Sequence, residues 1–341
     1  MGRTVLAAIL LIALAISRTA AAPAPDGIWF APGPGTVDYV NLFEHPEQWP
    51  RARALFDVFK FYQQHTQTPA PDIVGPNTYD ALVRAGAFQT LMTWGKKIAI
   101  EAGSVKEFYC TPDASGMNQS IANTVDSIRA VQQAAGTVTY IAQDDPFASG
   151  RAAGCGGPAL EPTADRIATY VRGVHAVFPS VQIGLIEAYP LSSESTLETI
   201  LGLLADRGAA PAFLHTDVDS RALRPLDDDF TRDMRALRSA SAARGISFGI
   251  IVWGYNGDSD VLYGQDAEHV VEEITRAFTR WADMPDHIII QSWAVSSTGL
   301  LITPSTLPDD RRYTHTTLLW EALRRLGGQD GPASGTAVPR R

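Results

Sequence analysis

The segment VQIGLIE at residues 181–187 is a short apolar run that ends on a carboxylate. Seven further short apolar runs recur along the chain, each leading into polar or aromatic residues, and most are followed by residues with the apolar spacing of a helix. Short runs rich in Val, Ile and Phe are typical of parallel strands that are buried on both faces. The seven other runs lie at residues 27–30, 58–62, 97–101, 138–141, 212–217, 246–253 and 287–291.

Helical stretches separate these runs. Ile121, Val125, Ile128 and Val131, for example, recur at helical spacing and share one face. Strands that alternate with helices eight times predict a closed parallel sheet, a single (β/α)8 TIM barrel, rather than an open doubly wound sheet. The chain also lacks the glycine-rich loops that bind nucleotide phosphates.

The two ends of the chain differ from the barrel in composition. The first 22 residues combine Arg3, an apolar run at 5–16 and small residues at 19–22, which is typical of a signal peptide. Because that run is too short to span a bilayer comfortably, we expect no membrane attachment after cleavage and a secreted or periplasmic protein. An uncleaved amino-terminal anchor is the alternative. The expected organisation is a signal peptide at 1–22, a barrel at 23–326 and a disordered tail at 327–341.

The overall charge limits the class of partner. The 341 residues carry a formal net charge of −9, which argues against nucleic acid and anionic membranes. An apolar fraction of 45% supplies one large core. We expect a monomer that needs no cofactor.

The two cysteines follow neighbouring strands. Cys110 lies after the third predicted strand and Cys155 after the fourth. In an oxidising compartment these positions predict a disulfide that braces the rim, and two unrelated thiols are the alternative.

Carboxylates stand at the ends of four consecutive strands: Glu101, the pair Asp144 and Asp145, Glu187, and Asp217. Side chains at the carboxyl ends of barrel strands meet at one mouth, and two carboxyl groups that face each other across a sugar can hydrolyse a glycosidic bond. We therefore predict Glu187 as general acid and Asp145 as nucleophile or base, with Asp217 as the alternative to Asp145. A pair from adjacent strands four and five suits retention, whereas a pair from strands four and six suits inversion.

Some of these residues also have a structural interpretation. Lys60 lies one strand from Glu101, and a buried Lys is costly without a partner, so the two are expected either to form an ion pair or to bind substrate. Asp144 and Asp145 can instead cap a turn at Pro146.

Aromatic and polar residues accompany the acids at the strand ends. Flat rings beside carboxylates suit stacking on a sugar face together with hydrogen bonds to its hydroxyls. We expect Trp253 and Trp293, at the ends of strands seven and eight, to form one wall of the mouth. The expected substrate-binding residues are Trp29, Lys60, Glu101, Asp144, Tyr189, His215, Trp253, Tyr255, Asn256, Gln291 and Trp293.

Residues 26–326 resemble secreted (β/α)8-barrel glycoside hydrolases, and the nearest matches are the segments QSW at 291–293 and VWGYN at 252–256. The resemblance implies a carbohydrate substrate. In the large retaining clan an acid/base Glu ends strand four and a nucleophile Glu ends strand seven, whereas this chain has QDDP at 143–146 and WGYN at 253–256. Either the acids have moved to strands four to six, or the protein binds sugar without cleaving it.

A second resemblance is to metal-dependent sugar-isomerase barrels. Glu187 together with HTDVD at 215–219 is similar to the carboxylate and imidazole set that holds a divalent ion there. Trp253 and Gln291 stand where such sites have a His and a Glu, so the leading interpretation has no metal.

Overall fold

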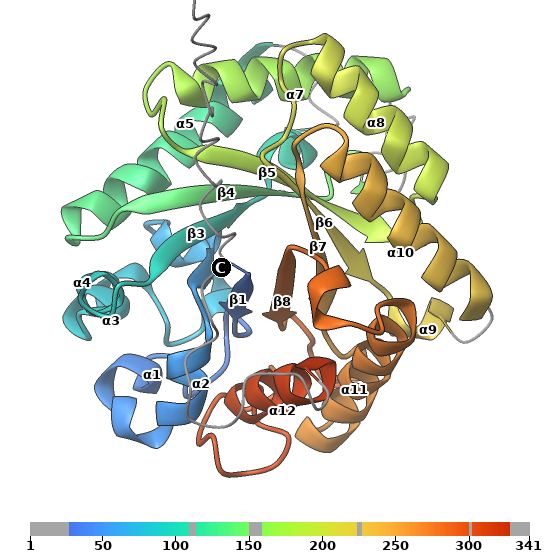
Figure 1. Ribbon diagram of the computed structural model, residues 1–341. Helices are drawn as coiled ribbons and strands as arrows, with labels where there is room; N and C mark the ends of the chain where they lie inside the picture. The colour runs from blue at the N-terminus through green and yellow to red at the C-terminus, as the bar shows by residue number, and fades with distance from the viewer. Residues whose placement is uncertain (1–26, 109–113, 150–158, 224–226, 300–301, 328–341) are drawn as a thin grey trace, which may run out of the picture.

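The computed structural model describes residues 27–108, 114–149, 159–223, 227–299 and 302–327. Parallel strands pair in chain order, and the last pairs with the first, so the sheet closes into a barrel with the helices outside it (Figure 1). The predicted single (β/α)8 TIM barrel is confirmed. The strands are β1 (Ile28–Ala31), β2 (Val58–Tyr62), β3 (Lys97–Ala102), β4 (Val138–Asp144), β5 (Gln182–Tyr189), β6 (Phe213–Val218), β7 (Ser247–Val252) and β8 (His287–Gln291).

The helices bury one apolar face each against the barrel. In α5 the residues Val125, Ile128 and Val131 are buried, as their spacing predicts. Helix α8 begins at Glu194, and the hydroxyl of the preceding Ser193 caps it by accepting a hydrogen bond from the backbone N–H of Thr196 at 3.3 Å. None of the described helices is long and apolar enough to cross a membrane. The helices are α1 (Asn41–Glu44), α2 (Pro50–Leu55), α3 (Tyr79–Arg84), α4 (Ala87–Thr93), α5 (Ala114–Gln133), α7 (Leu160–His175), α8 (Glu194–Asp206), α9 (Ser220–Leu223), α10 (Asp227–Ala242), α11 (Asp260–Ala277) and α12 (His315–Gly327), with 3-10 turns η1 (Pro46–Gln48), η2 (Gln63–Thr66), η3 (Asp72–Val74), η4 (Ser104–Phe108) and η5 (Trp281–Asp283).

Ring contacts identify the side chains that point into the barrel. The ring of Trp29 meets those of Tyr140, Phe213, His215 and His287 at centroid distances between 4.8 and 5.4 Å, although the five residues come from four different strands. Rings from strands on opposite sides of a barrel can meet only in its interior. Because side chains alternate along a strand, every second residue from these positions also faces inward.

Two glycines make room for these rings. A Cβ on Gly184 would lie 2.4 Å from the ring of Phe213, and a Cβ on Gly249 would lie 2.7 Å from the ring of His215. Both glycines therefore face inward, which fixes the orientation of β5 and β7.

The inward side chains stack in layers contributed by alternate strands. Tyr62 on β2 is in register with Glu101, which is in register with Ala142, and the strand tilt advances a layer by about one residue per strand. Asp144 on β4 therefore lies level with Tyr62. The same step repeated around the barrel gives the mouth layer, which is Tyr62, Asp144, Asp217 and Gln291. The layer below it contains Ala31, Glu101, Ile186 and Ile251.

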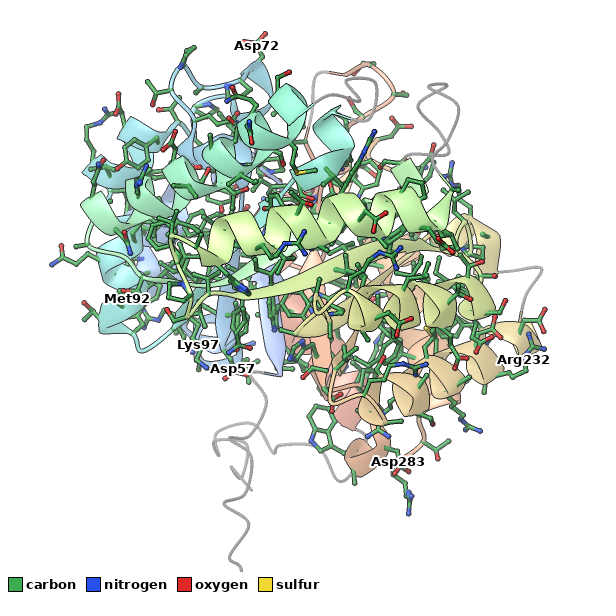
Figure 2. The ribbon with its side chains drawn as sticks, turned by 90° about the horizontal axis from the view of Figure 1, so that it is seen from above. Asp57, Asp72, Met92, Lys97, Arg232 and Asp283 are labelled. Atoms are coloured by element: carbon green, nitrogen blue, oxygen red, sulfur yellow. The ribbon has the colours of Figure 1, made fainter. Side chains whose placement is uncertain are left out.

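Figure 2 shows the barrel from the side. Asp57, Lys97 and Asp283 lie at the edge where strands begin, and Asp72 lies at the opposite edge, where the strands end. The mouth layer belongs to the second edge.

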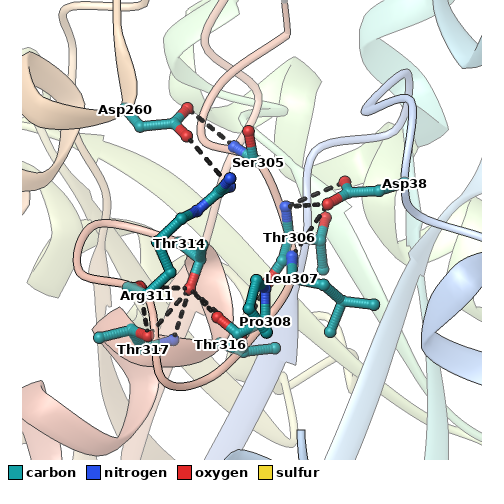
Figure 3. Close-up of polar contacts among 10 residues, drawn as sticks. All are labelled: Asp38, Asp260, Ser305, Thr306, Leu307, Pro308, Arg311, Thr314, Thr316 and Thr317. Carbon is teal, nitrogen blue, oxygen red and sulfur yellow. Dashed lines mark hydrogen bonds and ion pairs between the residues drawn. The ribbon is translucent and has the colours of Figure 1, made fainter. Parts of the chain in front are cut away.

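The connection between β8 and α12 is fixed to the loops beside it (Figure 3). The carboxylate of Asp38, after β1, accepts hydrogen bonds at 2.9 Å from the backbone N–H groups of Thr306 and Leu307. Asp260, at the start of α11, accepts one from the backbone N–H of Ser305 at 2.9 Å. This side of the rim is therefore held in place before any ligand binds.

Candidate active site

The mouth layer combines two carboxylates, Asp144 and Asp217, with a tyrosine and an amide. Directly below lies a third carboxylate, Glu101, which is 6% exposed. We call Glu101, Asp144 and Asp217 the mouth acids. They come from β3, β4 and β6, three of the four strands on which the sequence places acids.

Two of the mouth acids have an ammonium partner. The fully buried Lys60 donates to the carboxylate of Glu101, so the ion pair that was the structural alternative for Lys60 is present. Lys106, from η4, forms an ion pair with Asp144. Burial opposes the charge on Lys106, but Asp144 outweighs it, and the pKa of Lys106 is raised. Lys106 lies in a loop rather than at a strand end, so the strand-end pattern in the sequence does not include it.

Asp217 has no ammonium partner among the described residues. Its Oδ1 atom is buried and makes no hydrogen bond within the part of the chain that the structure describes. Burial, and then the charges of Asp144 and Glu101, raise the pKa of Asp217 from 3.8 to about 7, although Lys60 opposes them. Asp217 can therefore carry a proton in neutral solution.

Asp145 begins the turn after β4. Its backbone has a left-handed φ of 47°, and its N–H donates to the carbonyl of Ile186 at 3.0 Å. The pKa of Asp145 is raised well above its usual value by burial and then by Asp144, Asp217 and Glu187. Its Oδ1 atom is also buried without a hydrogen-bond partner among the described residues. Asp145 thus belongs to the edge of the cluster and not to the mouth layer.

Glu187 does not face the mouth, so the prediction that it is the general acid is wrong. Gly184 on the same strand faces inward, so Glu187, three residues later, faces the helices. Its carboxylate accepts hydrogen bonds from the backbone N–H groups of Phe147 at 2.8 Å and Ala148 at 3.0 Å. Glu187 therefore holds the loop that follows β4, next to the acids of that loop.

Tyr189 shares the outward orientation of Glu187. Its hydroxyl donates to Asp233 of α10 at 2.9 Å, and its ring packs on Phe230. The prediction that Tyr189 binds substrate is wrong, because the residue packs between the strand and its helix.

Trp29 and His215 also lie away from the mouth. Trp29 is fully buried, and His215 is one inward step below Asp217 on the same strand. The Nε2 atom of His215 lies 2.9 Å from Nδ1 of His287. Burial, and then His287, lower the pKa of His215 well below its usual value, so it stays neutral. Both residues fill the core, so the prediction that they contact substrate is wrong.

Aromatic rings line the β7 and β8 side of the rim. The ring centroids of Trp253 and Trp293 lie 4.7 Å apart, and those of Tyr255 and Trp253 lie 6.2 Å apart. Trp293 is 42% exposed, whereas Trp253 is 4% exposed and its Nε1 has no acceptor among the described residues. The guanidinium of Arg221 covers the ring of Tyr255 at 3.4 Å and is itself paired with Asp219. We call Trp253, Tyr255 and Trp293 the aromatic wall.

The two predicted amides have different surroundings. Asn256 accepts from the backbone N–H of Asp258 at 3.0 Å and so shapes its own turn. Gln291 lies in the mouth layer, and its side-chain oxygen accepts from Lys60. Tyr62, which the sequence analysis missed, lies in the same layer, and its hydroxyl donates to the carbonyl of Ser292 at 2.6 Å. Its spacing of two residues from Lys60 was the signal that could have found it.

The metal-isomerase arrangement is not assembled. Glu187 faces outward and His215 contacts His287, so neither joins Asp217. Over the described ranges, no group of three or more His, Cys, Asp or Glu side chains is placed to hold a metal ion. Cys110 and Cys155 lie outside the described residues.

Comparisons with known proteins support the fold. No family model matches the chain, and no curated protein matches it significantly. Among solved structures, a modular endo-β-1,4-mannanase of glycoside hydrolase family 26 from Cellulomonas fimi aligns at a TM-score of 0.56 with 13% identity, over 92% of this chain and 76% of the mannanase. An endo-β1,6-glucanase aligns at 0.53 with 10% identity, over 89% of this chain and 75% of that chain.

A psychrophilic family 10 endo-β-1,4-xylanase aligns at a TM-score of 0.51 with 11% identity, over 86% of this chain and 96% of the xylanase. The chain spans 59% of the length of a glucosidase from Croceicoccus marinus, at a TM-score of 0.46. The three glycoside hydrolases with a TM-score above 0.5 named here share the (β/α)8 barrel, and at these identities the likeness shows the fold alone.

Proposed function

We propose that the chain is a glycoside hydrolase that cleaves a poly- or oligosaccharide at the mouth layer, with Asp217 as general acid. The observation that carries the proposal is that Asp217 is the mouth acid without an ion-pair partner among the described residues and has a pKa of about 7. Hydrolysis of a glycosidic bond requires a carboxylic acid that is protonated near the working pH and faces a second carboxylate. Asp144, in the same layer, is that second carboxylate.

The position of this pair favours inversion. Asp144 and Asp217 lie on β4 and β6, with β5 between them. Two strand spacings place their backbones about 10 Å apart, and side chains that point into a barrel converge. Inverting enzymes separate their carboxyl groups by about 6.5 to 9.5 Å, which leaves room for a water molecule. In this scheme Asp217 protonates the leaving oxygen and Asp144 activates the water.

The aromatic wall gives the sugar a place to bind. Trp293 presents an exposed face on the β7 and β8 side of the rim, and the N–H of Trp253, which has no acceptor among the described residues, can donate to a sugar oxygen. The glycoside hydrolase neighbours agree with this substrate class. We propose in addition that the chain is exported through residues 1–22, that the barrel alone acts as a monomer, and that Cys110 and Cys155 form a disulfide.

The test is a reducing-sugar assay on β-1,4-mannan, β-1,4-xylan and β-1,6-glucan, with and without chelator. We expect cleavage that is indifferent to chelator and that is lost in Asp217→Asn and Asp144→Asn. Asp219→Asn, which changes a paired carboxylate on the same rim, is the matched control and should remain active. Proton NMR of the first product should show inverted anomeric configuration.

Two outcomes would contradict the proposal. Full activity in Asp217→Asn would remove the acid assignment. Binding of these polysaccharides without cleavage by the wild-type protein would instead favour a carbohydrate-binding barrel.

A further inference from the structure

Lys60 connects the mouth layer to the layer below it. Its side chain is fully buried, and its ammonium donates to the carboxylate of Glu101 and to the side-chain oxygen of Gln291. Gln291 is 2% exposed. One buried cation thus fixes both an acid below the mouth layer and an amide within it.

The chemistry of Lys60 determines the orientation of that amide. An ammonium has three donors and no acceptor, so only the oxygen of Gln291 can face it. The amide nitrogen must then point away from Lys60. Among the described residues no protein group accepts a hydrogen bond from this NH2 group, and the group is not one of the unpaired side-chain atoms that are closed off from solvent. A polar group that no protein atom pairs is satisfied by water, or by a ligand that takes the place of that water.

The surroundings of the NH2 group indicate what satisfies it. Gln291 shares its layer with Asp217, whose Oδ1 is a buried acceptor that pairs with no described residue. A donor and an acceptor that are both unpaired in one layer match a hydroxyl group, which accepts from the first and donates to the second. Sugar hydroxyls have this property.

We infer that Lys60 is a positioning residue that holds the Gln291 amide so that its NH2 group donates to a substrate hydroxyl next to Asp217. This inference rests on the proposed function and makes it more specific. It assigns Gln291 to substrate binding and gives the Lys60 and Glu101 pair a role beyond the stability of the core.

The central test is Gln291→Glu, which is nearly isosteric. The variant keeps an oxygen for Lys60 and replaces the mouth-facing NH2 donor by an acceptor. We expect a melting temperature close to the wild-type value and at least about a tenfold loss of affinity for hexasaccharides of β-1,4-mannan, β-1,4-xylan and β-1,6-glucan, measured by calorimetry. Gln119→Glu, which makes the same change of amide to carboxylate on the exposed side of α5, is the matched control and should keep binding within about threefold.

The role of Lys60 needs a variant that leaves no buried charge unpaired. Lys60→Met combined with Glu101→Met removes the pair as a unit, which cores often tolerate. We expect this double variant to fold and to bind the hexasaccharides about fivefold more weakly, because Gln291 is then free to rotate. Adding Gln291→Leu to it should cause little further loss, whereas Gln291→Leu in the wild-type background should weaken binding.

The outcomes separate this inference from the proposed function. If the wild-type protein binds a hexasaccharide and Gln291→Glu binds it equally well, the inference is wrong and the hydrolase proposal stands. If the wild-type protein neither binds nor cleaves any of the three glycans, both fail. Additive losses for Gln291→Leu and the Lys60/Glu101 double variant would show that Lys60 does not act through Gln291.

Discussion

Replacing Asp217 by Asn should make the protein more stable above neutral pH while it abolishes activity. The folded state holds this carboxyl at a pKa of about 7, compared with about 4 in an unfolded chain. Between these values the unfolded state ionises and the folded state does not. The folded state then binds more protons, so the free energy of unfolding falls as the pH rises through this window.

The size of the effect follows from the pKa values. A difference of about three pKa units lowers the free energy of unfolding by up to about 4 kcal/mol. This loss of stability is absent below pH 4 and complete above pH 7. Asn cannot ionise and avoids this loss. We therefore expect equal stability of Asp217→Asn and wild type at pH 4, and a melting temperature roughly 5 to 10 °C higher for the variant at pH 8.

Thermal denaturation followed by circular dichroism at both pH values is the assay. Asp219→Asn is the control, since hydrogen bonds from Arg221 outweigh burial and lower the pKa of Asp219. That variant should lose a little stability at pH 8 rather than gain it. An Asp217→Asn variant that is no more stable than wild type at pH 8, or that gains as much at pH 4, would refute the argument that Asp217 titrates near neutrality.

Three further predictions follow from the same contacts. Cleavage of the preferred polysaccharide should fall about tenfold per pH unit above pH 7, as Asp217 loses its proton, and a pH–rate profile that stays flat to pH 9 would contradict this. Glu187→Ala should lower the free energy of unfolding in urea by about 2 to 4 kcal/mol, because the N–H groups of Phe147 and Ala148 lose their acceptor, and unchanged stability would contradict that role. Trp293→Ala should weaken hexasaccharide binding about fivefold without changing the melting temperature. Trp253 is buried, so Trp253→Ala should lower the free energy of unfolding by about 3 kcal/mol. The reverse pattern would show that the aromatic wall is not a binding surface.

Much of the fold could be predicted from the sequence because each barrel strand is a short apolar run that can be recognised from its own residues. Each run predicted as a strand overlaps an observed one, and the run at 138–141 proved to extend to Asp144. The extension includes Gln143 and Asp144, polar residues that no apolar pattern can include. The strand ends at the mouth are polar, so their boundaries are the part of the fold that hydrophobicity predicts least well.

The site was predicted only in part, because strand membership does not reveal which way a side chain points. On β2 a charged Lys60 inside an apolar run indicates a partner within the barrel, and Glu101 was correctly considered as that partner. On β5 the residues from Ile183 to Glu187 are all buried, so the alternation that marks an inward face is absent. A strand covered on both faces has no apolar side and no polar side to compare.

What fixes the orientation of β5 is a contact with another strand. Gly184 faces inward because the ring of Phe213 occupies the space that a Cβ would need, and Phe213 lies an even number of residues before Asp217. The same contact therefore turns Glu187 toward the helices and Asp217 toward the mouth. Such a pairing between distant residues leaves no trace in the pattern of either strand. The carboxylate to test first is thus Asp217, because it lies on the same inward face of its strand as the rings that pack in the core.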